Sequence, residues 1–231
     1  MFAVPSRPLQ AVTFDLDGLM FNTEELYQEV GEQLLARRQR ELSDELIDRM
    51  MGRKSAEALQ LMIDWHRLDA TTEELEQESA AIFLEMLPSR LAPMPGLVEL
   101  LAALEQARVP KGIATSSGRE FVRTVLEKFA WEPRFDFVLA SENVRHGKPA
   151  PEIYHLAAER HGVAPQQMMV LEDTPVGCRA AVAADSYAVA VPAGRTLGQQ
   201  FPPVAFHASS LADPRIYAAL GLDPPSDRQT A

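Results

Sequence analysis

A short apolar run that ends in two aspartates constrains this chain more than any other stretch of its sequence. Residues 11–14 read Ala-Val-Thr-Phe, the pattern of a fully buried strand, and Asp15, Asp17 and Gly18 follow directly. Alternate residues of an extended chain point to the same side, so the two carboxylates are expected to share one face. Two like charges this close are unfavourable unless a cation or a shared proton relieves them. The stretch therefore predicts either a chemical site at a strand end or a plain Asp-Gly turn without function.

Composition limits the partners of the protein. The chain has 231 residues, 46% of them hydrophobic, and a formal net charge of −11. This suits a globular protein with one domain, or one domain and an insertion. The negative charge argues against nucleic acid and anionic membranes as partners. A single cysteine, Cys178, fits a cytoplasmic location, and we expect no signal peptide and no membrane span. We expect a monomer or a weak homodimer.

Residues 23–91 read as a helical block with little strand signal. Three residues stand where helix N-caps are expected: Thr23, Ser43 and Thr71. Glu74 completes a capping box with the last of these. The block is expected to end at prolines, which then form a linker: Pro88, Pro93 and Pro95. We therefore expect a helical domain over residues 23–92, inserted into a core made of residues 1–22 and 93–231.

From Gly96 onward, predicted helices alternate with predicted strands. Strands are expected over residues 111–115, 135–140, 168–171 and 188–191. Helices are expected over residues 97–107, 120–129, 151–161 and 175–184. The signals weaken after Pro192. The alternation predicts an α/β fold with a doubly wound parallel sheet. In such sheets, ligands bind at the carboxyl ends of the strands.

Chemically active residues follow four of the predicted strands. They are Asp15 and Asp17 after the first strand, Thr115 and Ser116 after the second, Lys148 in the loop after the third, and Glu172 and Asp173 after the fourth. A random arrangement of core strands would seldom bring two acid pairs, hydroxyls and a lysine to one edge of a sheet. This convergence favours the chemical site over the plain turn.

These residue types suit phosphoryl transfer. Four carboxylates with no histidine or cysteine at metal-ligand spacing form a hard oxygen site, which favours Mg²⁺. Lys148 supplies a further positive charge, and the Thr115 hydroxyl with neighbouring backbone N–H groups, around Ser116, can bind phosphoryl oxygens. One aspartate can then attack phosphorus, while the other protonates the leaving alcohol and later activates water.

The same residues resemble the four motifs of the haloacid dehalogenase superfamily of phosphohydrolases. The motifs are Asp-x-Asp-Gly at residues 15–18, an apolar strand ending in Thr at residues 112–115, the lysine at residue 148, and the acidic pair at residues 172–173. The resemblance covers nearly the whole chain. The helical insertion resembles the small cap of the β-phosphoglucomutase-like subfamily, and further stretches resemble its pseudouridine-5′-phosphatase-like branch. Phosphatases of other small sugar phosphates carry similar motifs.

The resemblance implies a role for each motif residue. It makes Asp15 the nucleophile and Asp17 the general acid and base. It implies a Mg²⁺ ion held by the Asp15 carboxylate, the Asp17 backbone carbonyl and Asp173, with Glu172 as a ligand directly or through water. Thr115 and Lys148 would bind the phosphoryl group. Asp17 also argues against the haloalkanoate dehalogenases of the superfamily, which lack an acid at that place.

Two residues of the helical block are candidates for contact with the substrate. Arg53 follows Gly52 at a break between predicted helices, and Glu24 lies just past the first motif. A helical lid over the strand ends would exclude water and position the substrate. The alternative is that both residues are solvated surface charges. Asn22 stands where many relatives carry Asp, and we expect it to affect hydrogen bonding in the cap or linker.

Together, these features predict a Mg²⁺-dependent phosphatase that acts on a small phosphomonoester, either a sugar or a nucleoside monophosphate. The first alternative is a phosphomutase of the β-phosphoglucomutase type, which uses the same residues but returns the phosphoryl group to a sugar. The second is a non-catalytic protein that binds a phosphorylated metabolite, although such a protein has no need for Asp17. A phosphoryl-accepting signalling domain would leave the helical insertion unexplained.

Overall fold

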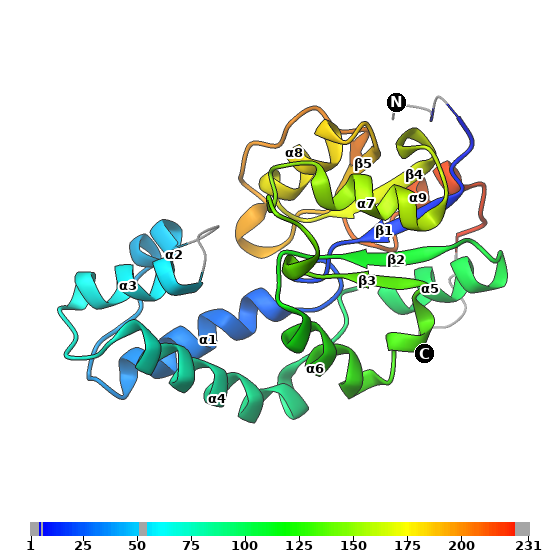
Figure 1. Ribbon diagram of the computed structural model, residues 1–231. Coiled ribbons are helices and arrows are strands. Elements are labelled where there is room, and N and C mark those ends of the chain that lie inside the picture. Colours follow the sequence, from blue (N-terminus) through cyan, green and yellow to red (C-terminus); the bar gives the residue numbers. More distant parts are fainter. Residues whose placement is uncertain (1–4, 6, 51–54, 225–231) are drawn as a thin grey trace. The chain divides into compact units, whose positions relative to one another are not determined.

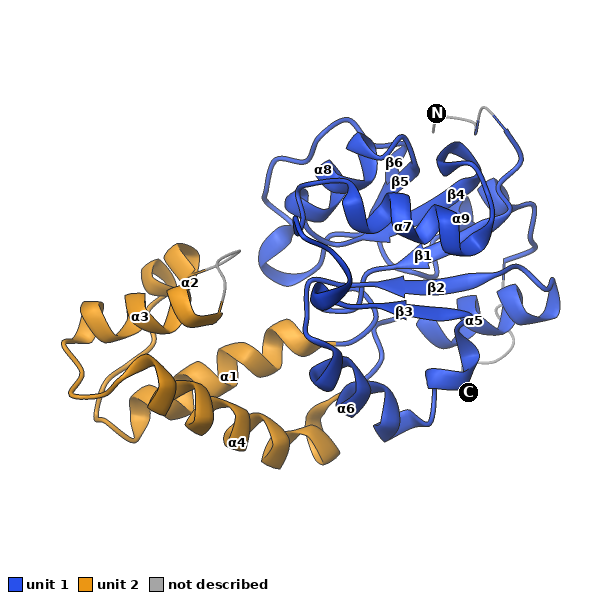
Figure 2. Ribbon diagram, in the orientation of Figure 1, with its two compact units in different colours: residues 1–21, 92–231 blue, residues 22–91 orange. Residues whose placement is uncertain are grey.

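The computed structural model describes residues 5, 7–50 and 55–224, which form two compact units. Residues 1–21 and 92–231 make the α/β unit, and residues 22–91 make the helical unit (Figure 2). The helical unit is an insertion, because the chain leaves the α/β unit after its first strand and later returns to it. The helical insertion predicted from the sequence pattern is therefore confirmed.

The α/β unit is built on a six-stranded parallel sheet with the order β3-β2-β1-β4-β5-β6. The strands are β1 (Ala11–Phe14), β2 (Lys111–Ala114), β3 (Phe137–Leu139), β4 (Met168–Glu172), β5 (Tyr187–Ala190) and β6 (Phe206–His207). The helices are α5 (Leu97–Gln106), α6 (Arg119–Phe129), α7 (Glu152–His161), α8 (Pro175–Ala183) and α9 (Pro214–Leu220). Figure 1 shows α7 and α8 on one side of the sheet and α5 and α6 on the other. The predicted doubly wound parallel sheet is confirmed.

Strand β1 lies in the middle of this sheet, between β2 and β4, and all four of its residues are buried. A strand that is covered on both faces needs apolar side chains on both, which explains the continuous apolar run instead of an alternating one. The chain builds β2 and β3 on one side of β1 and then crosses over to β4 on the other side. The carboxyl ends of β1 and β4 thus meet where the strand order reverses, the place where open α/β sheets bind ligands.

One polar side chain interrupts the apolar run of β1, and a histidine satisfies it. Thr13 is fully buried; its hydroxyl lies 3.2 Å from Nε2 of His161, the last residue of α7, and donates to the Met168 sulfur at 3.1 Å. The imidazole also packs on the Phe137 ring, with 4.6 Å between ring centroids. Burial lowers the pKa of His161 below its ordinary value, although the charge of Asp136 and the Val12 backbone oppose the shift.

This lowered pKa makes the stability of the fold depend on pH. The unfolded state, in which a histidine titrates near about 6.5, binds the proton more readily than the folded state. The free energy of unfolding is therefore unaffected by His161 above that pH. It decreases as the pH falls toward the pKa of the folded state, by at most about 1.4 kcal/mol per pH unit. We expect urea unfolding of His161→Gln to show a smaller loss of stability between about pH 7.5 and 5.5 than the wild type. The control is His155→Gln, an exposed histidine of the same helix, and an unchanged slope in His161→Gln would contradict the assignment.

Within residues 22–50 and 55–91, the described part of the helical unit, there are four helices: α1 (Thr23–Ala36), α2 (Asp44–Met50), α3 (Ser55–His66) and α4 (Thr72–Arg90). The capping box predicted for Thr71 and Glu74 is present at the start of α4, and the Ser43 hydroxyl accepts the backbone N–H of Leu46 at the start of α2. Asn22 donates from its side-chain amide to the backbone carbonyl of Arg90, which ties the first residue of the unit to its last helix. None of the helices in the described part of the chain has both the length and the apolar character needed to cross a membrane.

Two expectations about local structure were wrong. Thr23 is the first helical residue of α1, and the cap position is Asn22, whose side chain makes no capping hydrogen bond. Helix α4 continues through Pro88 to Arg90. The proline removes only the hydrogen bond to Leu84, whose side chain is 55% exposed, so the helix loses one bond on its solvated face. The elements β6 and α9 lie beyond Pro192, where the sequence showed no clear pattern.

Candidate active site

The acidic residues of the first and fourth motifs meet at the carboxyl ends of β1 and β4. The backbone N–H of Asp15 donates to the Leu171 carbonyl at 3.0 Å, which extends the pairing of the two strands by one residue. Glu172 ends β4, and Asp173 follows it. Oxygen atoms of these three acids lie within 4.8 Å of one another, and all three residues are buried, with exposed fractions of 7%, 1% and 2%. The predicted meeting of the first and fourth strand ends therefore occurs.

Lys148 reaches into this acidic cluster from the loop after β3. Its ammonium nitrogen lies 2.5 Å from Oδ1 of Asp15 and 2.7 Å from Oε1 of Glu172, and it also donates to the Ala114 carbonyl at 3.0 Å. The lysine side chain is only 5% exposed. An ammonium group has three N–H donors, and three acceptors surround this one, so its position is determined by β1, β2 and β4 together.

Among the described residues, three buried carboxylates lie close together and the Lys148 ammonium contacts two of them, and the pKa values reflect this burial and crowding. Burial raises the pKa of Asp15 to about 8; Lys148 opposes this shift, and the charges of Glu172 and Asp17 add to it. Burial disfavours the charged form of Lys148, but Asp15 and Glu172 raise its pKa above the ordinary value. The lysine therefore stays charged, and the carboxylates remain under-compensated. A divalent cation held by their hard oxygen atoms would relieve the repulsion, so the donor set fits such an ion.

Asp17 is held next to the cluster by hydroxyl groups that follow β2. Its Oδ2 atom accepts the Ser117 hydroxyl at 2.5 Å and the Thr115 hydroxyl at 3.3 Å. The backbone N–H of Ser117 in turn donates to the Thr115 oxygen at 3.0 Å. Gly18 makes the turn that follows Asp17, with φ of +73°, a conformation that glycine adopts without strain. Asp17 thus has a defined orientation beside the acidic cluster.

The structure brings most, but not all, of the predicted site residues together. Six of them come together at one edge of the sheet: Asp15, Asp17, Thr115, Lys148, Glu172 and Asp173. Ser116 lies at the same strand end, but its side chain is exposed. Glu24 is an exposed residue in the first turn of α1, within the helical unit. Arg53 lies outside the described residues.

Sequence reasoning missed two side chains of this site. Ser117 holds Asp17, and Tyr154 of α7 donates its hydroxyl to Glu172 at 2.6 Å. A signal for Ser117 existed, because residues 115 and 117 of an extended segment point to the same side. Tyr154 stands six residues after Lys148 in a helix with an ordinary apolar face, so only the folded structure connects it with the acidic pair.

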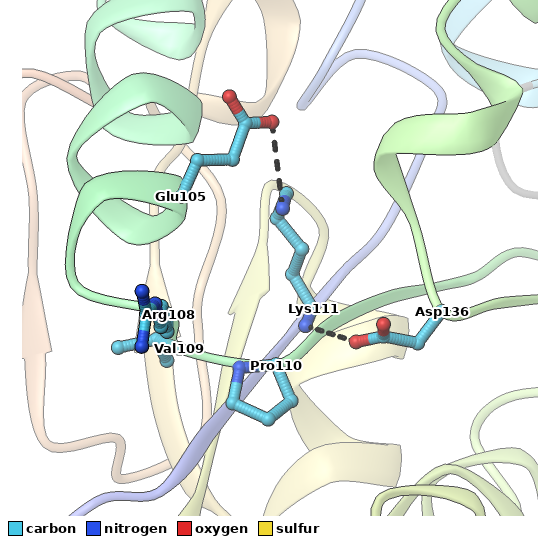
Figure 3. Close-up of a pocket in the computed structure, with 6 residues that line it drawn as sticks. All are labelled: Glu105, Arg108, Val109, Pro110, Lys111 and Asp136. Carbon is cyan, nitrogen blue, oxygen red and sulfur yellow. Dashed lines mark hydrogen bonds and ion pairs between the residues drawn. The ribbon is translucent and has the colours of Figure 1, made fainter.

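A second group of charges, at the opposite end of the sheet, is not part of this site. A cavity of about 260 Å³ at the start of β2 is lined by Glu105, Arg108, Val109, Pro110, Lys111 and Asp136 (Figure 3). The Lys111 ammonium lies 3.4 Å from Glu105, and its backbone N–H donates to Asp136 at 2.9 Å (Figure 3). Arg134 also pairs with Glu105 through two hydrogen bonds. Both Lys111 and Arg134 pair with Glu105 here, in contrast to the acidic cluster at the carboxyl ends of the strands.

Comparison with known proteins places the chain in a family. The model of the haloacid dehalogenase-like hydrolases matches residues 12–191. A probable pseudouridine-5′-phosphatase of Drosophila melanogaster is 32% identical over 213 residues, which cover 90% of this chain and 92% of the relative. A phosphorylated carbohydrates phosphatase of Thermotoga maritima is 30% identical over 180 residues, covering 76% of this chain and 82% of that protein.

Solved structures agree with this placement. The structure of a putative β-phosphoglucomutase from Thermotoga maritima has a TM-score of 0.71 and 27% identity, and the match covers 82% of this chain and 90% of that one. The matched region of the family model contains both aspartates of the first motif, Lys148 and the acidic pair. The chain therefore belongs to the haloacid dehalogenase-like hydrolases and is a phosphatase of that family.

Proposed function

We propose that this protein hydrolyses a small phosphomonoester, a sugar or nucleoside monophosphate, through a phosphoryl group carried on Asp15. The observation that supports this most directly is the Lys148 ammonium, which lies 2.5 Å from Asp15 while Asp17 is held beside the same cluster by Ser117. A buried carboxylate next to a lysine, with a second, oriented carboxylate nearby, has the parts that nucleophilic phosphoryl transfer needs. Relatives named as phosphatases of phosphorylated carbohydrates and of pseudouridine 5′-phosphate suggest the substrate class.

In the first half of the proposed reaction, a carboxylate oxygen of Asp15 forms a bond to phosphorus as the bond to the leaving oxygen breaks. Asp17, as the carboxylic acid, gives its proton to the leaving alkoxide. Lys148 and the Thr115 hydroxyl, with backbone N–H groups near Ser116, bind the phosphoryl oxygens. In the second half, the Asp17 carboxylate takes a proton from water, which attacks phosphorus. Inorganic phosphate leaves, and the Asp15 carboxylate and the Asp17 acid are regenerated.

Mg²⁺ is the proposed cofactor, with the Asp15 carboxylate, Asp173 and the Asp17 backbone carbonyl as its ligands. Both oxygens of Glu172 already accept hydrogen bonds from protein groups, which favours a contact with the ion through water. The ion would supply positive charge to a phosphate dianion in a site that is otherwise acidic.

A panel of sugar and nucleoside monophosphates, assayed for phosphate release, tests the function and the metal together. We expect release from one substrate or a few, falling by at least about 100-fold with EDTA and returning with added Mg²⁺. Release that is indifferent to EDTA would contradict the cofactor. Product that forms only with an added sugar bisphosphate would identify a phosphomutase. Binding of these esters without turnover would identify a binding protein.

We infer that the helical unit, proposed as residues 23–92, acts as a cap that positions the leaving group, with Glu24 and Arg53 in contact with it. The same panel tests this inference. Arg53→Ala and Glu24→Gln should change the ranking of substrates more than they change hydrolysis of a minimal aryl phosphate. Equal losses on both would contradict it. We also propose a cytoplasmic location. The protein is proposed to be a monomer or a weak homodimer, and light scattering of the purified protein tests this oligomeric state.

A further inference from the structure

Glu172 is confined more completely than a metal ligand alone would require. Its Oε1 atom accepts the Lys148 ammonium at 2.7 Å and the Tyr154 hydroxyl at 2.6 Å. Its Oε2 atom accepts the Thr174 hydroxyl at 3.2 Å. Gly177 closes the remaining side, because a Cβ atom there would lie 1.7–2.2 Å from the carboxylate atoms of Glu172. The carboxylate therefore has a single available orientation.

Tyr154 contacts two members of this site at once. It is fully buried, its hydroxyl donates to Glu172, and its ring lies under the Lys148 ammonium, with 5.0 Å between the nitrogen and the ring centroid. Burial, together with the charges of Glu172 and Asp15, raises the pKa of Tyr154 well above its ordinary value, so the phenol stays a neutral donor. A cation over an aromatic face is attracted to it, most strongly where water is excluded.

We propose that Tyr154 is a positioning residue for phosphoryl transfer: its hydroxyl holds Glu172, and its ring and Glu172 together hold Lys148 on Asp15. The inference rests on the proposed function. A phenylalanine in its place would keep the ring under Lys148 but remove the hydroxyl that donates to Oε1 of Glu172. Of the two donors to this oxygen, Lys148 and Tyr154, only the lysine would then remain. The carboxylate would then compete more strongly with Asp15 and the phosphoryl oxygens for the ammonium group. The loss is expected where charge moves onto the phosphoryl oxygens, which is the transition state.

The test compares Tyr154→Phe with the wild type on any monoester that the wild type hydrolyses. We expect kcat to fall about tenfold, KM to change by less than about threefold, and the inhibition constant of orthovanadate to rise about tenfold, in parallel with kcat. Tyr154→Leu, which removes the ring as well, should lose more. Tyr217→Phe is the matched control, because Tyr217 is also fully buried in the α/β unit and its hydroxyl has no hydrogen-bond partner among the described residues.

A double-mutant cycle shows whether Tyr154 acts through the lysine. In a Lys148→Met background, Tyr154→Phe should change kcat by less than about twofold. Thermal unfolding gives the folded fraction of each variant, and kcat is expressed per folded molecule. A lowered unfolding midpoint with unchanged kcat and vanadate inhibition would overturn the inference, because Tyr154 would then only fill space. Turnover by the wild type decides the proposed function separately, since the inference depends only on the ratio between variants.

Discussion

Asp15→Asn is expected to lower kcat on every phosphomonoester by at least about 10⁴-fold while the protein stays folded. The amide has the size of the carboxylate, and its oxygen can still accept a hydrogen bond from Lys148, but it is a poor nucleophile. The expected measurement is phosphate release from the best substrate of the panel, together with phosphoryl label on the protein in an acid quench. The wild type should carry label during turnover, and the variant should carry none.

The stability of this variant provides a check with a definite sign. Because the pKa of Asp15 is raised in the folded protein to about 8, the folded state binds its proton more tightly than the unfolded state. Ionisation of Asp15 therefore destabilises the folded protein: the free energy of unfolding falls as the pH rises from the pKa of the unfolded state toward that of the folded state. Without added metal at neutral pH, Asp15→Asn should be at least as stable as the wild type. Asp136→Asn, at the other end of the sheet, is the control. Activity within about tenfold of the wild type would refute Asp15 as the nucleophile.

Asp17→Asn is expected to stop the reaction at a different point. With a sugar or nucleoside monophosphate, kcat should fall by about 10²- to 10⁴-fold, because the leaving alkoxide needs a proton and the variant has none to give. An aryl phosphate with an acidic phenol does not need that proton. Its first half-reaction should proceed, and the second should fail because no carboxylate activates water.

The signature of this arrest is a burst. Rapid-quench assays should show one equivalent of phenol released per enzyme, followed by little further turnover, and intact-protein mass spectrometry should show one added phosphoryl group. Ser117 and Thr115 remain as hydroxyl partners for the amide at position 17, so the geometry is kept. Asp136→Asn should turn over the aryl phosphate as the wild type does. Repeated turnover of the aryl phosphate by Asp17→Asn at the wild-type rate would assign the second half-reaction to another base.

Elements with a strong local signal were predictable from the sequence. The apolar run at residues 11–14 indicated a fully buried strand, because a strand covered on both faces needs apolar side chains on both. The capping box at Thr71 is a contact between residues three apart, so the local sequence is enough to predict it. The grouping of Asp15, Lys148 and Glu172 was also predictable, since parallel strands bring their carboxyl ends to one edge.

Tertiary structure decided the rest, because it depends on contacts between distant residues. Strand β6 forms because the chain after Pro192 pairs with β5, and a strand of two residues is too short for a local sequence pattern to predict. Whether Asn22 or Thr23 begins α1 depends on backbone geometry where the chain enters the helical unit, and both residues are acceptable caps by type. Tyr154 sits on the buried face of α7 like its apolar neighbours, and only the packing of that helix over the sheet brings its hydroxyl to Glu172. The sequence by itself determined the fold class and the groups available for chemistry. The tertiary structure decided which groups hold one another in place, because hydrogen bonds and burial depend on distances that a linear pattern does not contain.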